Sequence, residues 1–197
     1  MRRELIPAFR ECTQALRRMD TEWAVGGAEA MAAHGYARET MDVDIFIGDD
    51  ARDELLATLE QRRLPVITVL ENVHYAITPN PKNDDVRVDL LFPSDEPEVS
   101  GIWKPTDLVI ADERVPVLRM EFIVASKLLT DPGSERGRKD AGDLSELQRR
   151  GLVDGPRVLD VLNDCPGKGR AKQRLMDLVA GPERSVAPST RRPKRTR

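Results

Sequence analysis

Residues 23–47, WAVGGAEAMAAHGYARETMDVDIFI, contain the pattern on which the expected fold rests. A short apolar run ends at Gly26 and Gly27, where the missing side chains let the backbone come close to a ligand. The alanine-rich segment that follows has a high intrinsic helix propensity and stops at Gly35. The stretch therefore predicts a strand, a glycine turn and a helix in succession.

Two aspartates, Asp42 and Asp44, follow on a segment of β-branched and apolar residues that suits a second strand. Alternate residues of a strand point to the same face, so both carboxylates project together, with Cα atoms about 6 to 7 Å apart. They repel each other unless a cation lies between them. Such oxygen ligands suit Mg²⁺, with Mn²⁺ as the alternative, and Mg²⁺ commonly also binds substrate phosphates.

The glycine turn is expected to complete this site, because the amides and the positive dipole end of a helix attract phosphate. Neither half of the pattern is specific when it occurs alone. A glycine pair is more often a tight turn, and two aspartates at a strand edge are commonly solvated. Their order here, with Arg38 and Thr40 just before the aspartates, favours a functional site.

The pattern GGxxxxxxHGxxRxTxDVDI, which starts at Gly26, resembles the first motif of the nucleotidyltransferase-fold superfamily. The resemblance is strongest to the AbiEii-like toxin and abortive-infection nucleotidyltransferases, and the fourteen residues between Gly27 and Asp42 are similar to that family's spacing. Aminoglycoside and lincosamide nucleotidyltransferases carry a related motif, so it identifies the superfamily better than the subfamily. The resemblance implies that Gly26, Gly27, Arg38 and Thr40 contact a nucleotide.

The remaining pattern predicts an α/β (α+β) fold, with a mixed sheet flanked by helices and a helical C-terminal part that closes the cleft. The expected helices are 3–19 (with its arginines on a solvated face), 49–63 (begun by an Asp cap), 120–129, 135–150, 155–164 and 168–180. The expected strands are 65–70, 75–78 and 86–92, with a small hairpin made by 108–110 and 115–118.

Three regions follow from these elements. We expect a catalytic core over residues 1–95, a mainly helical region over 96–181, and a disordered basic tail over 182–197. The tail fits a solubilising terminus and an RNA contact equally well.

Composition limits the cellular setting. The formal net charge of −3 over 197 residues does not by itself indicate a nucleic-acid binder. Cys12 and Cys165 have neither metal nor redox spacing and are expected to be reduced thiols. No signal-peptide pattern and no apolar run near ~18 residues is found, so we expect a soluble, cytoplasmic protein without membrane contact.

Asp89 lies in the middle of an otherwise apolar predicted strand. An acid there is costly to bury unpaired, so it either pairs with an arginine or completes a metal site. Its surroundings, VDLLF, resemble the superfamily motif in which a third carboxylate joins the first two. That resemblance implies that Asp89 is a catalytic third metal ligand or a base.

Lys127 lies in a mostly apolar predicted helix, where a lysine usually extends its ammonium to the surface. The alternative is a contact between the ammonium and nucleotide phosphate. KLL followed by GRKDAGDL resembles a downstream pattern of AbiEii-like proteins, which implies a nucleotide contact for Lys127 and a place near the active centre for Asp140. Asp140 and Asp143 share a helix face with basic neighbours, so simple ion pairing competes with this interpretation.

The expected function is Mg²⁺-dependent transfer of a nucleoside monophosphate from an NTP to an acceptor hydroxyl. His34 and His74 provide no catalytic pair. The AbiEii-like resemblance implies a tRNA acceptor and a cognate antitoxin as partner. Two alternatives stay open: an antibiotic nucleotidyltransferase of the aminoglycoside or lincosamide type, and a nucleotide-binding module without catalysis.

Overall fold

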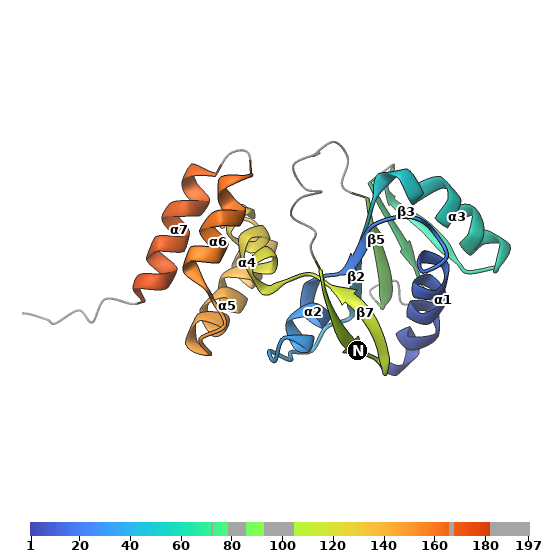
Figure 1. Cartoon of the computed structure of the whole chain (residues 1–197), viewed down its shortest axis with the longest axis horizontal. Coiled ribbons are helices and arrows are strands. Elements are labelled where there is room, and N and C mark those ends of the chain that lie inside the picture. The colour runs from blue at the N-terminus through green and yellow to red at the C-terminus, as the bar shows by residue number, and fades with distance from the viewer. Residues whose placement is uncertain (72, 79–85, 93–104, 166–167, 182–197) are drawn as a thin grey trace, which may run out of the picture.

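A seven-stranded mixed sheet forms the centre of the computed structural model, which describes residues 1–71, 73–78, 86–92, 105–165 and 168–181 (Figure 1). The strand order is β3-β4-β5-β2-β1-β7-β6, which confirms the expected α/β class. The strands are β1 (Trp23–Val25), β2 (Asp42–Ile47), β3 (Val66–Leu70), β4 (His74–Ile77), β5 (Arg87–Leu91), β6 (Thr106–Ile110) and β7 (Glu113–Val117).

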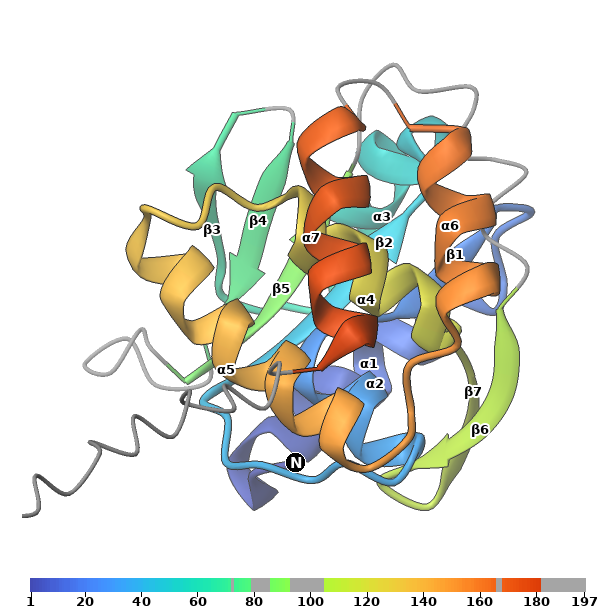
Figure 2. The same ribbon diagram turned by 90° about the vertical axis from the view of Figure 1, so that its left-hand side faces the viewer.

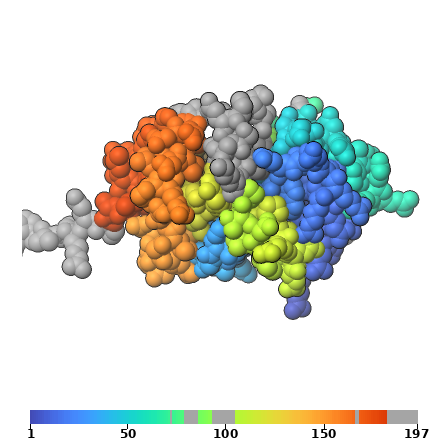
Figure 3. Space-filling model, in the orientation of Figure 1, coloured from blue at the N-terminus to red at the C-terminus, as the bar shows by residue number. Residues whose placement is uncertain are grey.

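Seven α-helices accompany the sheet in the described part of the chain. They are α1 (Ile6–Leu16), α2 (Gly27–Ala33), α3 (Arg52–Gln61), α4 (Met120–Leu129), α5 (Glu135–Arg149), α6 (Gly155–Asn163) and α7 (Gly169–Ala180). Figures 1 and 2 show α1 and α3 on one side of the sheet and the bundle α4–α7 on the other. In the space-filling view the bundle forms one end of the elongated molecule and the N-terminal elements form the other (Figure 3).

The two faces of strand β2 differ in burial. Val43, Ile45 and Ile47 are buried, whereas Asp42 and Asp44 alternate with them and stay partly exposed. Every second side chain of β2 is apolar and buried, and this alternation fixes the register, because a slip of one residue would turn the aspartates into the core. The pattern of β2 therefore directs both carboxylates towards the side that carries the bundle.

The helix α1 is shorter than the expected 3–19, because a 3-10 turn (Arg3–Leu5) precedes it. Its arginines lie on a partly solvated face, as expected, and two of them also make ion pairs that the sequence did not indicate. Arg10 Nε and Arg17 Nη2 each lie 3.2 Å from the carboxylate of Glu113, so they tie α1 to β7. The sequence could not reveal this contact, since Glu113 lies about a hundred residues away.

The helix α3 also begins differently from the expectation. A 3-10 turn (Asp49–Ala51) takes the place of the expected first helical turn, and α3 starts at Arg52. The residue at the N-cap is Ala51, which has no side chain that could accept a capping hydrogen bond. The expected Asp cap is therefore wrong.

The hairpin of β6 and β7 extends the sheet. Its turn residues, Ala111 and Asp112, have φ values of 51° and 64°, which matches the two-residue turn that suits the twist of paired strands. β7 then runs parallel to β1, with Val25 opposite Val117. The sheet thus continues beyond residue 95, where we expected the catalytic core to end; the expected tail at 182–197 lies outside the described residues.

The four C-terminal helices were all expected from sequence. Ser134 caps α5 by accepting a hydrogen bond from the Gly137 amide (2.9 Å), and Asp154 caps α6 by accepting one from the Arg157 amide (3.2 Å). Buried leucines and valines of this bundle join the core of the sheet in one continuous cluster. None of the helices in the described ranges combines the length and apolar character needed to cross a membrane.

A core substitution tests the packing of α3 against the rest of the fold. Leu59→Ala should lower the free energy of unfolding by about 2–5 kcal/mol, because Leu59 is fully buried and its loss leaves a cavity. Leu70→Ala, at a residue 58% exposed on β3, should change it by less than about 0.5 kcal/mol. Urea unfolding measures both, and equal effects would contradict the packing described here.

Candidate active site

The acidic residues of β2 and β5 meet because these strands pair in parallel. Asp44 lies directly opposite Asp89, and Asp42 lies opposite Arg87. Residues opposite each other on neighbouring strands project from the same face of the sheet, about 5 Å apart at the backbone. The structure therefore brings Asp44 and Asp89 side by side.

The glycine turn packs directly against the side chain of Asp44. Gly27 has a φ of +58°, and a Cβ at this position would lie 1.8 Å from Asp44 Oδ2. The amide of Gly26 donates a hydrogen bond to the Asp44 carbonyl (2.9 Å), and a Cβ on Gly26 would lie 2.4 Å from the Phe46 ring. Gly27 is required so that the carboxylate of Asp44 can sit at the start of α2, and Gly26 is required to leave room for the Phe46 ring.

Burial and the neighbouring carboxylates change the acidity of Asp44. Burial raises its pKa to about 6, and the nearby negative charges of Asp42 and Asp89 act in the same direction. A bound cation would remove this repulsion. Thr40 donates a hydrogen bond from Oγ1 to Asp42 Oδ1, which holds the second carboxylate in place.

The pair Asp42 and Asp44 fits a Mg²⁺ ion, because Mg²⁺ is usually held by one or two carboxylates together with substrate phosphates and water. Among the described residues, no three His, Cys, Asp or Glu side chains are gathered so that they could hold a metal ion. A Mg²⁺ ion held by the pair would take its other ligands from substrate phosphates and water. The metal would add to the partial charge neutralisation that Lys127 and Arg136 already supply to Asp44.

Asp89 is 3% exposed and has two partners on a single oxygen. His74 Nε2 lies 2.7 Å from its Oδ1, and Arg87 Nε lies 2.8 Å from the same atom. These contacts correspond to the arginine-pair alternative for a buried acid. Asp89 lies beside Asp44 but does not form a three-ligand cluster with the described residues, so its role as metal ligand or base is a proposal.

A pocket of about 360 Å³ opens beside Asp44, between the sheet and the helical bundle. Apolar side chains from both parts make up most of its wall, and a few charged groups converge on it. Its size and character are typical of a small-molecule site. The lining residues are Gly27, Asp44, Phe46, Leu91, Leu118, Phe122, Ile123, Ala125, Ser126, Lys127, Leu129, Thr130, Arg136, Asp140, Val161 and Cys165.

Lys127 does not extend its ammonium to the surface, since the residue is only 8% exposed. Its Nζ donates to Asp140 Oδ1 (2.5 Å) and to Asp143 Oδ2 (2.8 Å), and both aspartates are 4% exposed. An ammonium carries three N–H donors, so these two contacts leave one for the pocket. The structure thus brings Lys127 and Asp140 to the same pocket as Asp44 and Gly27.

Arg38 and Thr40 lie elsewhere. They line a separate hollow of about 570 Å³ that is formed with the N-terminal residues and Glu29. Arg38 Nε lies 2.9 Å from Asp143 Oδ1, and its Nη1 donates to the carbonyl of Glu39 (3.1 Å). The two residues expected to contact nucleotide are therefore engaged with protein groups.

Sequence reasoning assigned no role to His74 or Arg87, and it named Asp143 only as a neighbour of Asp140. The spacing of Arg87 and Asp89, two residues apart on a predicted strand, does indicate that both side chains point to one face. His74 reaches Asp89 only through the antiparallel pairing of β4 with β5, which no local pattern encodes. The apolar wall of the pocket likewise comes from elements far apart in the chain.

The similarity to known proteins is structural. No protein-family model matches the sequence, and no curated protein matches it. The chain is similar to the solution structure of the antibiotic-resistance factor ANT(2'')-Ia, with a TM-score of 0.51 and 17% identity over 92% of this chain and 86% of that one. It is also similar to an antigenic nucleotidyltransferase-like protein from Paracoccidioides brasiliensis, with a TM-score of 0.52 and 18% identity over 88% of this chain and 85% of that one.

At such low identity these similarities show the fold alone. The chain has the fold of nucleotidyltransferase-like proteins, as the resemblance of its first motif implied. Membership of the AbiEii-like subfamily stays a prediction.

A pair of glycine substitutions tests the contact between the glycine turn and Asp44. Gly151→Ala should cost about 1–2 kcal/mol in unfolding free energy, because Gly151 has a φ of +70° but open space around its Cβ position. Gly27→Ala has the same backbone strain and adds the collision with Asp44, so it should cost clearly more. Chemical denaturation measures both; equal losses would show that Asp44 does not occupy the space described.

The raised pKa of Asp44 predicts a pH-dependent stability. The folded state holds this proton more tightly than the unfolded chain does, so Asp44 favours folding at low pH. That contribution is lost as the pH rises through about 6. In EDTA at pH 7.5, Asp44→Asn should therefore be more stable than the wild type, by on the order of 2 kcal/mol, and the difference should shrink at pH 4.

Mn²⁺ should reverse this order at pH 7.5 by stabilising the wild type and not Asp44→Asn. Asp53→Asn, at a side chain 90% exposed on α3, is the matched control and should follow the wild type throughout. Thermal melting at both pH values measures all three proteins. A wild type that gains nothing from Mn²⁺ would contradict the fit of the carboxylate pair to a cation.

Proposed function

We propose that this protein transfers a nucleoside monophosphate from an NTP to an acceptor hydroxyl. The observation that carries the proposal is Asp44, seated against Gly27 at the edge of a pocket that also contains Lys127, with Asp42 two residues before it on the same face of β2. The nucleotidyltransferase-like fold supports it. A carboxylate pair, a buried cation and an apolar pocket together suit a triphosphate joined to a base and sugar.

Each group has a role in this proposal. Asp42 and Asp44 would hold Mg²⁺ or Mn²⁺, which supplies positive charge to the triphosphate and to the oxygens of the attacking and leaving groups. Gly26 and Gly27 let the phosphates approach the backbone, and Lys127 offers its remaining N–H to them. The base and sugar would occupy the apolar part of the pocket, between the sheet and α4.

The reaction forms one bond and breaks one. The acceptor oxygen attacks the α-phosphorus, and the bond from that phosphorus to the oxygen of the β-phosphate breaks, so that pyrophosphate leaves. Asp89 is assigned as third carboxylate ligand or as the base that receives the hydroxyl proton. His74 and Arg87 both bind Oδ1, so Oδ2 is the atom that would serve either role.

We propose tRNA as the acceptor, with the AbiEii-like toxins as the subfamily and an antitoxin as the protein partner. Exposed basic residues of α5 support a polyanionic acceptor. Arg136 lies at the pocket and its side chain is 78% exposed, and Arg138 and Lys139 follow it on the surface. Lysine and arginine on such a rim contribute to nucleic-acid binding through phosphate contacts.

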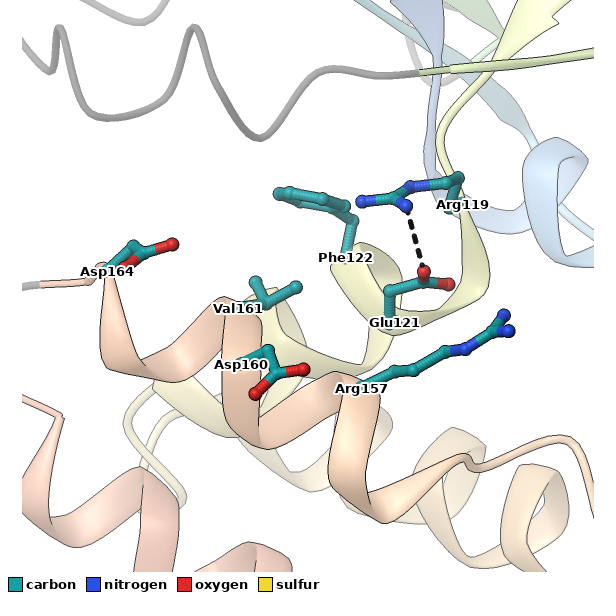
Figure 4. A pocket seen from close by; sticks show the side chains of 7 residues that line it. All are labelled: Arg119, Glu121, Phe122, Arg157, Asp160, Val161 and Asp164. Carbon is teal, nitrogen blue, oxygen red and sulfur yellow. Dashed lines mark ion pairs between the residues drawn. The ribbon is translucent and has the colours of Figure 1, made fainter.

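A specific observation favours a small cationic acceptor, such as an aminoglycoside, as the second candidate. A pocket of about 440 Å³ shares Phe122 and Val161 with the first one and lies between α4 and α6 (Figure 4). Its arginines already have acidic partners: Arg119 pairs with Glu121 (3.3 Å), and Arg157 pairs with Asp154 (3.3 Å). Asp160 and Asp164 remain as the charges that would attract an amine.

Incorporation of label tests the function and separates the acceptors. The protein is incubated with each α-labelled NTP and Mg²⁺, in one series with total tRNA and in another with an aminoglycoside panel. Label should enter tRNA, and Asp44→Asn should reduce it by at least about 100-fold, the loss typical of removing one electrostatic stabiliser of the transition state. Asp53→Asn should leave it unchanged.

Label in a drug and none in tRNA would move the protein to the antibiotic-modifying class. NTP binding by equilibrium dialysis, without label in either acceptor, would favour a nucleotide-binding module and contradict the transfer proposed here.

A further inference from the structure

Residues 35–41 join α2 to β2 and are here named the 35–41 segment. The segment leads directly into Asp42 and carries Arg38 and Thr40. These two residues line a hollow separate from the pocket beside Asp44, which is named the nucleotide pocket here. The segment has no helix or strand of its own to fix its course. Its position must therefore come from contacts with other elements.

The helix α5 holds the first half of the segment through two side chains. Asp143, which is 4% exposed, forms an ion pair with Arg38, whose Nε lies 2.9 Å from Oδ1, and accepts a hydrogen bond from the hydroxyl of Tyr36 (3.4 Å). Arg150, at the C-cap of α5, places its guanidinium 4.9 Å from the centre of the Tyr36 ring and donates to the Gly35 carbonyl (3.4 Å). A buried ion pair restricts the movement of its two side chains, because separating them would leave a charge buried without its partner.

The second half of the segment holds Asp42. The hydroxyl of Thr40 donates to Asp42 Oδ1, and the carbonyl of Met41 accepts from the Arg87 amide (3.3 Å). Asp42 is partly exposed, so packing alone does not select one orientation of its carboxylate. The Thr40 hydroxyl is the group that does so.

Asp143 also connects this arrangement to the nucleotide pocket. Its Oδ2 accepts a hydrogen bond from Lys127 Nζ (2.8 Å), while its Oδ1 forms the ion pair with Arg38. Lys127 and Arg38 are thus held by the same buried carboxylate, one on the bundle side and one on the sheet side. A displacement of α5 would therefore change the positions of both Lys127 and Arg38.

We propose that Arg38 is a positioning residue, which acts through the 35–41 segment and Thr40 to aim the Asp42 carboxylate beside Asp44. It contacts no nucleotide phosphate. Asp143 makes the alignment dependent on the docking of α5, so the helical bundle helps to set the geometry of the carboxylate pair. This inference rests on the part of the proposed function in which Asp42 and Asp44 bind a divalent cation.

Mn²⁺ binding to the nucleotide-free protein separates positioning from phosphate contact. Thr40→Val removes the hydroxyl that orients Asp42, and Arg38→Gln removes the pair with Asp143. Thr40→Val should weaken Mn²⁺ binding about tenfold, the effect typical of losing a group that orients a metal ligand, and Arg38→Gln should weaken it at least about threefold. The dissociation constants are measured by electron paramagnetic resonance of free Mn²⁺.

The double variant Arg38→Gln/Thr40→Val should bind Mn²⁺ no more weakly than Thr40→Val, because both changes interrupt one chain of contacts. Arg62→Gln is the matched control. Arg62 pairs with Glu11 at 2.7 Å, and its side chain is 23% exposed, against 21% for Arg38. It makes no contact with Asp42 or Asp44 among those described. This variant should bind Mn²⁺ like the wild type.

ATP binding in EDTA completes the test. If Arg38 is a positioning residue, Arg38→Gln should bind metal-free ATP as the wild type does. If Arg38 instead contacts phosphate, Arg38→Gln should bind ATP more weakly and should bind Mn²⁺ in the absence of nucleotide as the wild type does. Circular dichroism of each variant checks folding, and Thr40→Val carries the test if Arg38→Gln unfolds.

The outcomes separate this inference from the proposed function. Normal Mn²⁺ binding by Arg38→Gln and Thr40→Val would overturn the positioning role and leave the metal site in place. A wild type that binds no Mn²⁺ would overturn both. The expected binding pattern in a protein that transfers no label would support the positioning role and overturn only the transfer reaction.

Discussion

The parallel pairing of β2 with β5 is the constraint on which the candidate site depends. It sets Asp44 opposite Asp89, while the alternation of β2 buries Val43 and Ile45 and turns the aspartates to the other face. Three negative charges on one small area of sheet are unfavourable. The fold tolerates them because Asp89 is compensated by neighbouring donors, and because Asp44 takes up a proton more readily than an ordinary aspartate.

The glycine turn and the helical bundle complete this arrangement from opposite directions. Gly27 has no side chain, and the carboxylate of Asp44 fills the space that a Cβ would occupy. The bundle brings Lys127 to the same pocket and fixes it between two buried aspartates. The site is thus assembled at a junction of two parts of the chain, where a substrate can contact both.

Much of the fold could be predicted from local pattern. The strand β2 was expected at its observed bounds, and the bundle helices within one or two residues, since period-2 and period-3.6 patterns are strong there. The start of α3 and the ion pairs of Arg10 and Arg17 could not be predicted from local pattern. A helix cap depends on the local backbone course, and an ion pair with Glu113 depends on the docking of α1 on β7.

For the candidate site, the sequence by itself determined the pair Asp42 and Asp44 and the glycine turn before them, because residues close in sequence share a face or a turn through local geometry. Only the tertiary structure decided the partners of Asp89, the burial of Lys127, and the engagement of Arg38 with Asp143 rather than with the pocket. These contacts join residues on separate elements. Strand pairing and helix docking set their distances, and the one-dimensional order of residues does not contain them.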